Sequence, residues 1–138
     1  MQFQRFNIIL GWFVLAISSV VYLSTVEPTA SFWDCGEFIA TAYNLEVGHP
    51  PGAPFFMILG RLFSAFVAPE NAALAINTLS ALSSSFTILF LFWTITAFAK
   101  KMALGGEKKE LEGGSMIAVL GSGLVGTLCY TFSDSFWF

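Results

Sequence analysis

Charged residues are scarce in this sequence. Only 11% of its 138 residues are Asp, Glu, Lys or Arg, against roughly 25% in a typical soluble domain, whereas 56% are hydrophobic. This balance excludes an ordinary water-soluble domain, and no basic tract supports nucleic-acid binding. The composition therefore indicates an integral membrane protein that has membrane lipids among its partners.

Cysteine and histidine are also rare. The two cysteines, Cys35 and Cys129, are far apart and form neither a disulfide framework nor a CxxC metal pair. We expect both to be unpaired. His49 is the only histidine. The sequence predicts no metal site, and it leaves open whether a divalent metal is needed.

Three long hydrophobic runs are present, at about residues 6–26, 72–99 and 116–132. Each is close to or above the ~20 residues that cross a bilayer. Backbone hydrogen bonding in lipid requires helices, so the predicted fold class is an all-α polytopic membrane protein. The first run is longer than the apolar core of a signal peptide, and we expect a retained signal anchor.

A shorter apolar run, Ala53–Ala68, is not expected to cross the membrane, because Arg61 lies near its middle and would cost ~2.5–3.5 kcal/mol there. With three spans, one side of the membrane receives most of the cations, namely Arg5, Lys100, Lys101, Lys108 and Lys109. The positive-inside rule then places the N-terminus in the cytoplasm. About residues 27–70 become an outer loop, and about 100–115 a cytoplasmic loop.

Two interfacial or re-entrant helices are expected in the outer loop, at about residues 32–45 and 54–67. Ser31 is a plausible N-cap of the first, with Asp34 at the capping-box position. From Asp34, helical spacing puts Glu37 on the same stripe. Two interpretations stay open: these carboxylates only cap and solvate the helix, or one of them is a general base toward a hydroxyl group.

The run from Gly48 to Pro54 predicts a stiff turn that begins at His49 and Pro50. It either connects two helices or fixes His49 near a phosphate or sugar. Arg61 is the one cation of the outer loop. It suits a lipid phosphate, but a salt bridge to Glu37 or Glu46, or snorkelling toward water, is slightly favoured.

Gly121-Ser122-Gly123-Leu124-Val125-Gly126 matches the GxGxxG pattern of dinucleotide-binding sites. The match lies inside the third hydrophobic run, with no preceding strand, so the nucleotide interpretation fails its context. Small residues at this spacing instead favour close packing between helices.

The stretch SFWDCGEFIATAYNLEVGHPPGAPFFMILGR, residues 31–61, resembles a signature of large membrane proteins common in Bacteroidetes. That family is related to human transmembrane protein 260 and is grouped with the GT-C protein O-mannosyltransferases. The resemblance implies a GT-C-like fold, with Asp34 as the acidic catalytic residue and Glu37 as its neighbour. It also matches His49, Pro50 and Pro51 to an HPP motif, although Gly52-Ala53-Pro54 replaces the usual Leu-Gly-Lys type continuation. Arg61 is the candidate substitute for that lysine.

The resemblance implies an inverting glycosyltransferase. A sugar, expected to be mannose, would move from a polyprenyl-phosphate donor to a Ser or Thr hydroxyl of an exported protein. Asp34 and Glu37 would be catalytic, and His49, Pro50 and Arg61 would bind substrate. The alternative is a non-enzymatic transporter or assembly subunit whose outer loop binds a partner.

The resemblance also implies a location and a larger context. We expect the bacterial cytoplasmic membrane, with the active loop on the periplasmic side. Such enzymes have many more spans, and the sequence ends in an aromatic cluster, Phe136-Trp137-Phe138. We therefore expect an N-terminal part of a longer protein that needs its remaining transmembrane helices and is not active alone.

Overall fold

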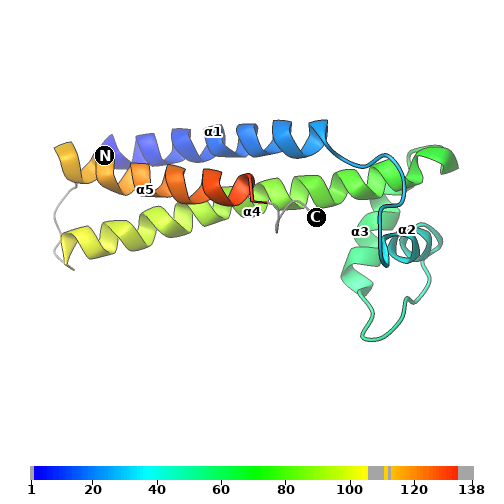
Figure 1. Cartoon of the computed structure of the whole chain (residues 1–138). Helices are drawn as coiled ribbons and strands as arrows, with labels where there is room; N and C mark the ends of the chain where they lie inside the picture. The colour runs from blue at the N-terminus through cyan, green and yellow to red at the C-terminus, as the bar shows by residue number, and fades with distance from the viewer. Residues whose placement is uncertain (1, 106–110, 112, 134–138) are drawn as a thin grey trace. The chain divides into compact units, whose positions relative to one another are not determined.

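The computed structural model describes residues 2–105, 111 and 113–133, and these residues form helices and no strand. The predicted all-α fold class is confirmed. The elements, shown in Figure 1, are α1 (Gln2–Ser24), α2 (Cys35–Asn44), α3 (Pro54–Ser64), the short 3-10 helix η1 (Pro69–Asn71), α4 (Ala72–Leu104) and α5 (Gly113–Thr131). Lys108 and Lys109 of the predicted cytoplasmic loop lie outside the described residues, as does the aromatic cluster at the end of the sequence.

Three helical segments are long and apolar enough to cross a membrane: Gln2–Ser24, Pro69–Leu104 and Gly113–Thr131. Helix α3 is apolar but has only 11 residues. At 1.5 Å per residue it reaches about half of the ~30 Å hydrocarbon core, so its length argues against a fourth span. Helix α4 continues five residues beyond the predicted end at 99 and stops before Gly105, whose φ of +55° suits a helix end.

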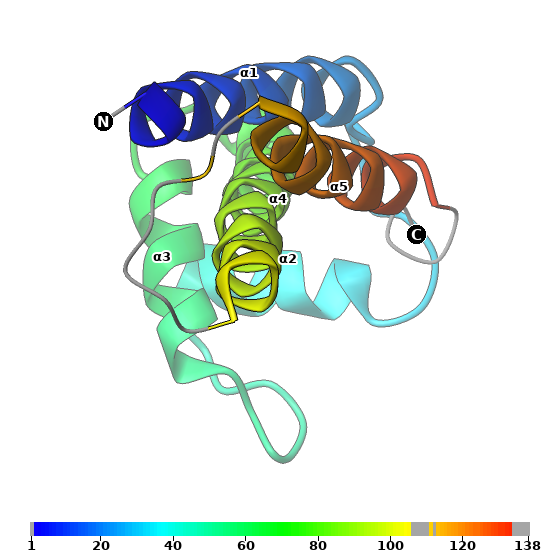
Figure 2. The ribbon, with the colours of Figure 1, turned by 90° about the vertical axis from the view of Figure 1, so that its left-hand side faces the viewer.

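The structure divides into two compact units. Unit 1 comprises Met1–Tyr22 and Ser84–Phe138, and unit 2 comprises Leu23–Ser83. In unit 1, α1 and α5 run alongside the second part of α4, as Figure 2 shows. The Trp93 indole of α4 donates to the Asn7 carbonyl of α1 at 3.3 Å. The Tyr22 hydroxyl of α1 donates to the Thr131 carbonyl of α5 at 3.2 Å, so all three helices are tied together.

Glycines allow the close approach of the helices in unit 1. A Cβ on Gly123 of α5 would lie 2.6 Å from the Thr96 Cγ2 of α4 and 2.8 Å from the Phe92 ring, and a Cβ on Gly126 would lie 2.9 Å from Ile95. These distances are shorter than real carbon contacts. The GxGxxG run therefore includes two positions of close packing between helices, as its sequence context predicts.

This packing gives a stability prediction. Gly123→Ala should destabilise the protein by about 1–2 kcal/mol, near the low end for overpacking because only one methyl is added. Gly121→Ala on the same helix is the matched control, since a Cβ at Gly121 meets nothing within 4 Å. The midpoint of thermal unfolding in detergent is measured for both variants. Equal midpoints for the two would contradict the packing.

Unit 2 has a small core of its own. Ala42 of α2, Met57 of α3 and Ile76 of α4 are buried together. Gly60 of α3 makes this possible, because a Cβ there would lie 2.8 Å from the Ala42 Cβ. Helices α2 and α3 therefore pack closely, and Phe38, Ile39 and Phe56 pack against the same core.

Asn77 of α4 holds the segment that precedes α2. Its side-chain amide donates to the carbonyls of Glu27 at 2.8 Å and Thr29 at 2.9 Å. Cys35 lies beside it, with Sγ 3.9 Å from the Asn77 side-chain oxygen. Cys35 and Cys129 are both free, as the sequence predicts.

The start of α2 differs from the sequence prediction. Ser31 is not the N-cap, because Trp33 has a φ of +63° and turns the backbone before the helix begins at Cys35. Asp34 occupies the N-cap position instead, and its carbonyl accepts the first helical hydrogen bond from Phe38 at 3.0 Å. The Asp34 side chain makes no capping hydrogen bond. The capping box predicted from Ser31 and Asp34 is therefore wrong.

Candidate functional site

The candidate site is built on α2, α3 and the connector between them, all within unit 2. Helix α2 ends at Asn44, and Leu45 takes the left-handed conformation that terminates it. The Glu46 amide donates back to the Thr41 carbonyl at 2.8 Å, which closes the helix end. The connector then returns toward the start of α2 and brings His49 next to Glu37.

Arg61 fastens α3 to α2. Its guanidinium donates to the Tyr43 carbonyl at 2.7 Å and lies over the Tyr43 ring at 5.2 Å from the centroid. The carbonyl belongs to the last turn of α2, where the helix dipole favours a cation. The structure shows no ion pair from Arg61 to Glu37 or Glu46, so the salt bridge considered from the sequence is not formed.

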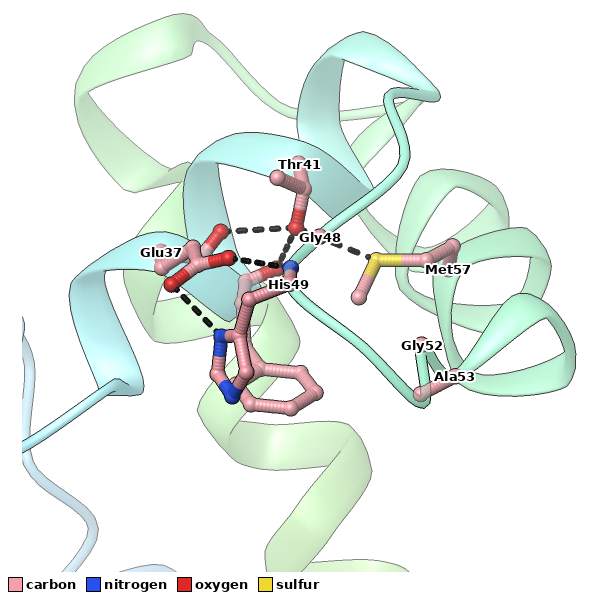
Figure 3. A pocket seen from close by; sticks show the side chains of 8 residues that line it. Glu37, Thr41, Gly48, His49, Gly52, Ala53 and Met57 are labelled. Atoms are coloured by element: carbon pink, nitrogen blue, oxygen red, sulfur yellow. Dashed lines mark hydrogen bonds and ion pairs between the residues drawn. The ribbon is translucent and has the colours of Figure 1, made fainter.

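Glu37 holds His49 at two points, as Figure 3 shows. One carboxylate oxygen accepts the His49 backbone N–H at 2.8 Å, and the other lies 2.9 Å from Nδ1 of the imidazole. The two residues are 12 positions apart in sequence. Phe38 packs edge-on against the ring, with centroids 6.3 Å apart. The orientation of the imidazole is therefore fixed from two sides.

The turn after His49 is short and closed. The Gly52 N–H donates to the His49 carbonyl at 2.9 Å, across Pro50 and Pro51. Gly52 has a φ of +74°, a conformation that is unfavourable for residues other than glycine. Gly48 also lies close to Glu37, because a Cβ there would be 3.2 Å from the Glu37 carboxylate, a tight contact. The stiff turn predicted from the sequence is present, and it begins at His49.

The contact between Glu37 and His49 shifts the pKa values of both residues so that the charged form of each is favoured. Two hydrogen bonds from His49 lower the pKa of Glu37 from its ordinary value of 4.5. The hydrogen bond to Glu37, and then its charge, raise the pKa of His49 from 6.5. At pH values between these two ordinary pKa values, the pair stabilises the connector. Its contribution fades when the pH rises through the raised pKa of His49 or falls through the lowered pKa of Glu37.

Asp34 lies on the other side of the imidazole. Its carboxylate is 3.9 Å from the His49 Nε2, and 64% of its side chain is exposed. The structure brings Asp34, Glu37 and His49 together, with the imidazole between the two carboxylates. Of the two acids, Glu37 is occupied by His49, whereas Asp34 is open to an incoming group.

The enclosed space at this site is small. The hollow between Glu37, His49 and Met57 has a volume of about 10 Å³, which is the room of about one water molecule. A sugar does not fit there, so a substrate would have to approach the exposed edge of His49 and Asp34. A groove of about 380 Å³ runs along the connector, with mostly apolar walls that include Leu45, Val47, Pro51 and Ile58.

Comparison with known proteins identifies the family of this sequence. Residues 34–138 match the family model described as the Protein O-mannosyl-transferase TMEM260 N-terminal domain. The chain belongs to this family. Asp34 is the first matched residue, so all five candidate residues lie within the TMEM260 N-terminal region.

Two relatives carry the same family name. Protein O-mannosyl-transferase tmem260 of Dictyostelium discoideum is 33% identical over 79 residues, which are 56% of this chain and 10% of that protein. Protein O-mannosyl-transferase TMEM260 of Mus musculus is 32% identical over 82 residues, 59% of this chain and 12% of that protein. The aligned part is thus a small share of either relative. No solved structure matches the chain significantly.

Two contacts of this TMEM260-type site were not predictable from residue spacing. The pairing of Glu37 with His49 depends on how the connector folds back, and the contact of Arg61 with Tyr43 depends on how α2 and α3 pack. The sequence offered one signal for the first contact, since the only histidine of the chain follows two carboxylates in the same loop. The substrate-binding roles of Pro50 and Arg61 stay predictions.

Proposed function

We propose that this chain is the N-terminal part of a GT-C-type membrane glycosyltransferase of inverting mechanism. It would move a sugar, expected to be mannose, from a polyprenyl phosphate to a Ser or Thr hydroxyl of an exported protein. Family membership and the names of both relatives support transfer of mannose to protein. Three helices that could cross a membrane support a lipid-linked donor.

Asp34 is the proposed general base. The observation that carries this role is its open carboxylate, which makes no capping hydrogen bond and is 64% exposed beside His49. The acceptor oxygen would bond to the anomeric carbon as the bond from that carbon to the phosphate oxygen breaks. The hydroxyl proton passes to Asp34, and the polyprenyl phosphate leaves with the electron pair.

His49 is proposed to steady the donor phosphate, at the edge of the turn that Pro50 and Pro51 stiffen. Its Nε2 points away from Glu37 toward the side of Asp34 and is part of a half-exposed ring. Arg61 is a weaker candidate for the same role, because one of its nitrogens already donates to Tyr43. Its contribution to the site is then to hold α3 in place.

The proposed location follows from charge. Arg5 lies near the start of α1, and Lys100 and Lys101 lie in the last turns of α4. Both ends would face the cytoplasm under the positive-inside rule. Residues 25–68 would then emerge on the outer side, which in a bacterium is the periplasmic face of the cytoplasmic membrane.

The test is transfer by the full-length protein reconstituted in liposomes. The probes are a polyprenyl-phosphate mannose and a Ser/Thr-rich peptide, with mass spectrometry of the peptide as readout. We expect addition of one hexose to a hydroxyl side chain, dependent on the lipid donor. A peptide that stays unmodified, while the same protein moves a solute or captures an exported partner, would replace the transferase proposal with the non-enzymatic alternative.

A further inference from the structure

Both carboxylate oxygens of Glu37 already contact His49. One oxygen accepts the His49 backbone N–H at 2.8 Å, and the other faces the imidazole Nδ1 at 2.9 Å. Only 39% of the Glu37 side chain is exposed, against 64% for Asp34. An acceptor hydroxyl at Glu37 would have to share an oxygen that already contacts His49, whereas Asp34 makes no such close contact.

The contact also decides which ring nitrogen carries a proton. An ionised carboxylate only accepts hydrogen bonds, so the Nδ1 beside Glu37 must carry N–H. This holds for the neutral ring as well as for the imidazolium. Protonation of His49 therefore changes only Nε2, from an acceptor into a donor. Nε2 is the nitrogen on the side of Asp34, at 3.9 Å from its carboxylate.

The charges around His49 explain why an anionic sugar donor would need His49 to be protonated. Asp34 and Glu37 flank the ring, and the hollow beside it is otherwise lined by uncharged residues, including Phe38, Thr41 and Met57. With neutral His49 the group carries two negative charges and presents a lone pair at Nε2. With imidazolium it carries one, and the half-exposed ring offers Nε2–H on the side of Asp34. A phosphate is repelled in the first state and has a donor in the second.

We propose that Glu37 is a positioning residue that acts on the donor phosphate through His49, by holding Nδ1 so that Nε2 becomes the phosphate-facing donor. This inference rests on the proposed function for the identity of the phosphate. It assigns to Glu37 no contact with the acceptor and no transfer of a proton from it. The raised pKa of His49 and the lowered pKa of Glu37 agree with the arrangement.

Glu37→Gln tests the proposal with almost no change of shape. The single amide oxygen can accept the His49 backbone N–H, which leaves the NH₂ group facing Nδ1. The neutral ring must then carry its proton on Nε2, and the imidazolium loses its acceptor. Nitrogen NMR of the histidine-labelled full-length protein measures both the tautomer and the titration of His49. The His49 signal is assigned by its loss in His49→Gln. We expect the Nδ1–H tautomer in the wild type, the Nε2–H tautomer in the variant, and a lower titration point in the variant.

Binding gives the second readout. The probe is polyprenyl phosphate without a sugar, added to the full-length protein in nanodiscs between pH 5.5 and 8.5. Wild-type affinity should fall as the pH rises through the titration of His49. Glu37→Gln should bind about tenfold more weakly near pH 6.5, because a neutral Nε2–H replaces the charge-assisted hydrogen bond of the imidazolium. Glu46→Gln is the matched control, since it removes a carboxylate of the same connector that does not contact His49, and it should bind like the wild type.

The two readouts do not depend on sugar transfer. The proposal is overturned if His49 has the same tautomer and titration point in Glu37→Gln as in the wild type, or if the two bind polyprenyl phosphate equally at every pH. Equal losses in Glu37→Gln and Glu46→Gln would also overturn it, because Glu46 makes no hydrogen bond to His49 and the loss could then not act through His49. If binding and NMR behave as expected and no peptide is modified, the transferase proposal fails and the positioning role of Glu37 stands.

Discussion

Asp34→Asn should abolish sugar transfer by the full-length protein, with a loss of kcat of at least about 10²–10⁴-fold. The reason is that the amide cannot take the proton of the acceptor hydroxyl, while its size and hydrogen-bonding shape are kept. Donor binding should not be lost, because the two contacts between Glu37 and His49 are untouched and the removed negative charge lies beside His49. The measurement is the initial rate of peptide modification in liposomes at saturating donor, together with the thermal midpoint of the variant.

The same variant separates catalysis from helix capping. Asn is as good an N-cap as Asp, so a merely capping Asp34 would tolerate this change. The carboxylate also makes no capping hydrogen bond in the structure, so folding should be unaffected. Glu46→Gln serves again as the control for loss of one negative charge in the loop. Transfer at the wild-type rate by Asp34→Asn would remove Asp34 as the base.

Arg61→Ala should lower the free energy of unfolding by about 2–3 kcal/mol. The change removes a hydrogen bond from a cation to the Tyr43 carbonyl, which typically contributes about 1.5–3 kcal/mol. It also removes the contact over the Tyr43 ring, which is worth about 0.5–1 kcal/mol at a partly exposed site. Denaturation of the purified protein in detergent measures the loss.

Arg61→Lys distinguishes this fastening role from phosphate binding. Lys keeps the positive charge but has no planar group to combine the carbonyl bond with stacking on Tyr43. If Arg61 holds α3 to α2, the lysine variant should lose part of the stability while its affinity for polyprenyl phosphate stays near that of the wild type. Full stability with a large loss of affinity would instead make Arg61 a ligand of the phosphate.

Hydropathy was sufficient to predict the fold class. Long apolar runs can satisfy their backbone groups in lipid only as helices, and the three that were expected coincide with the three long apolar helices. The short run with Arg61 was separated from them by its length and charge. The structure adds that Arg61 turns toward Tyr43, so this charge is met by a backbone carbonyl rather than by a carboxylate.

Local detail was less predictable. The start of α2 is set by the backbone turn at Trp33, which has a φ of +63°. No propensity rule predicts this left-handed conformation for a tryptophan. The partner of His49 is set by packing, because Gly60 lets α3 approach Ala42 and the connector must then fold back along α2. Periodicity places Asp34 and Glu37 on one stripe of a helix. It does not reveal that one of them is occupied by a histidine and the other is open.

The most direct measurement is a structure of the full-length protein with a non-transferable polyprenyl-phosphate sugar analogue and an acceptor peptide. The account predicts the Asp34 carboxylate within about 2.6–3.2 Å of the acceptor hydroxyl, which lies opposite the phosphate across the anomeric carbon. It also predicts His49 Nε2 on the phosphate while Nδ1 stays on Glu37. Asp34 turned away from the sugar and bonded to the N–H groups of α2 would contradict it.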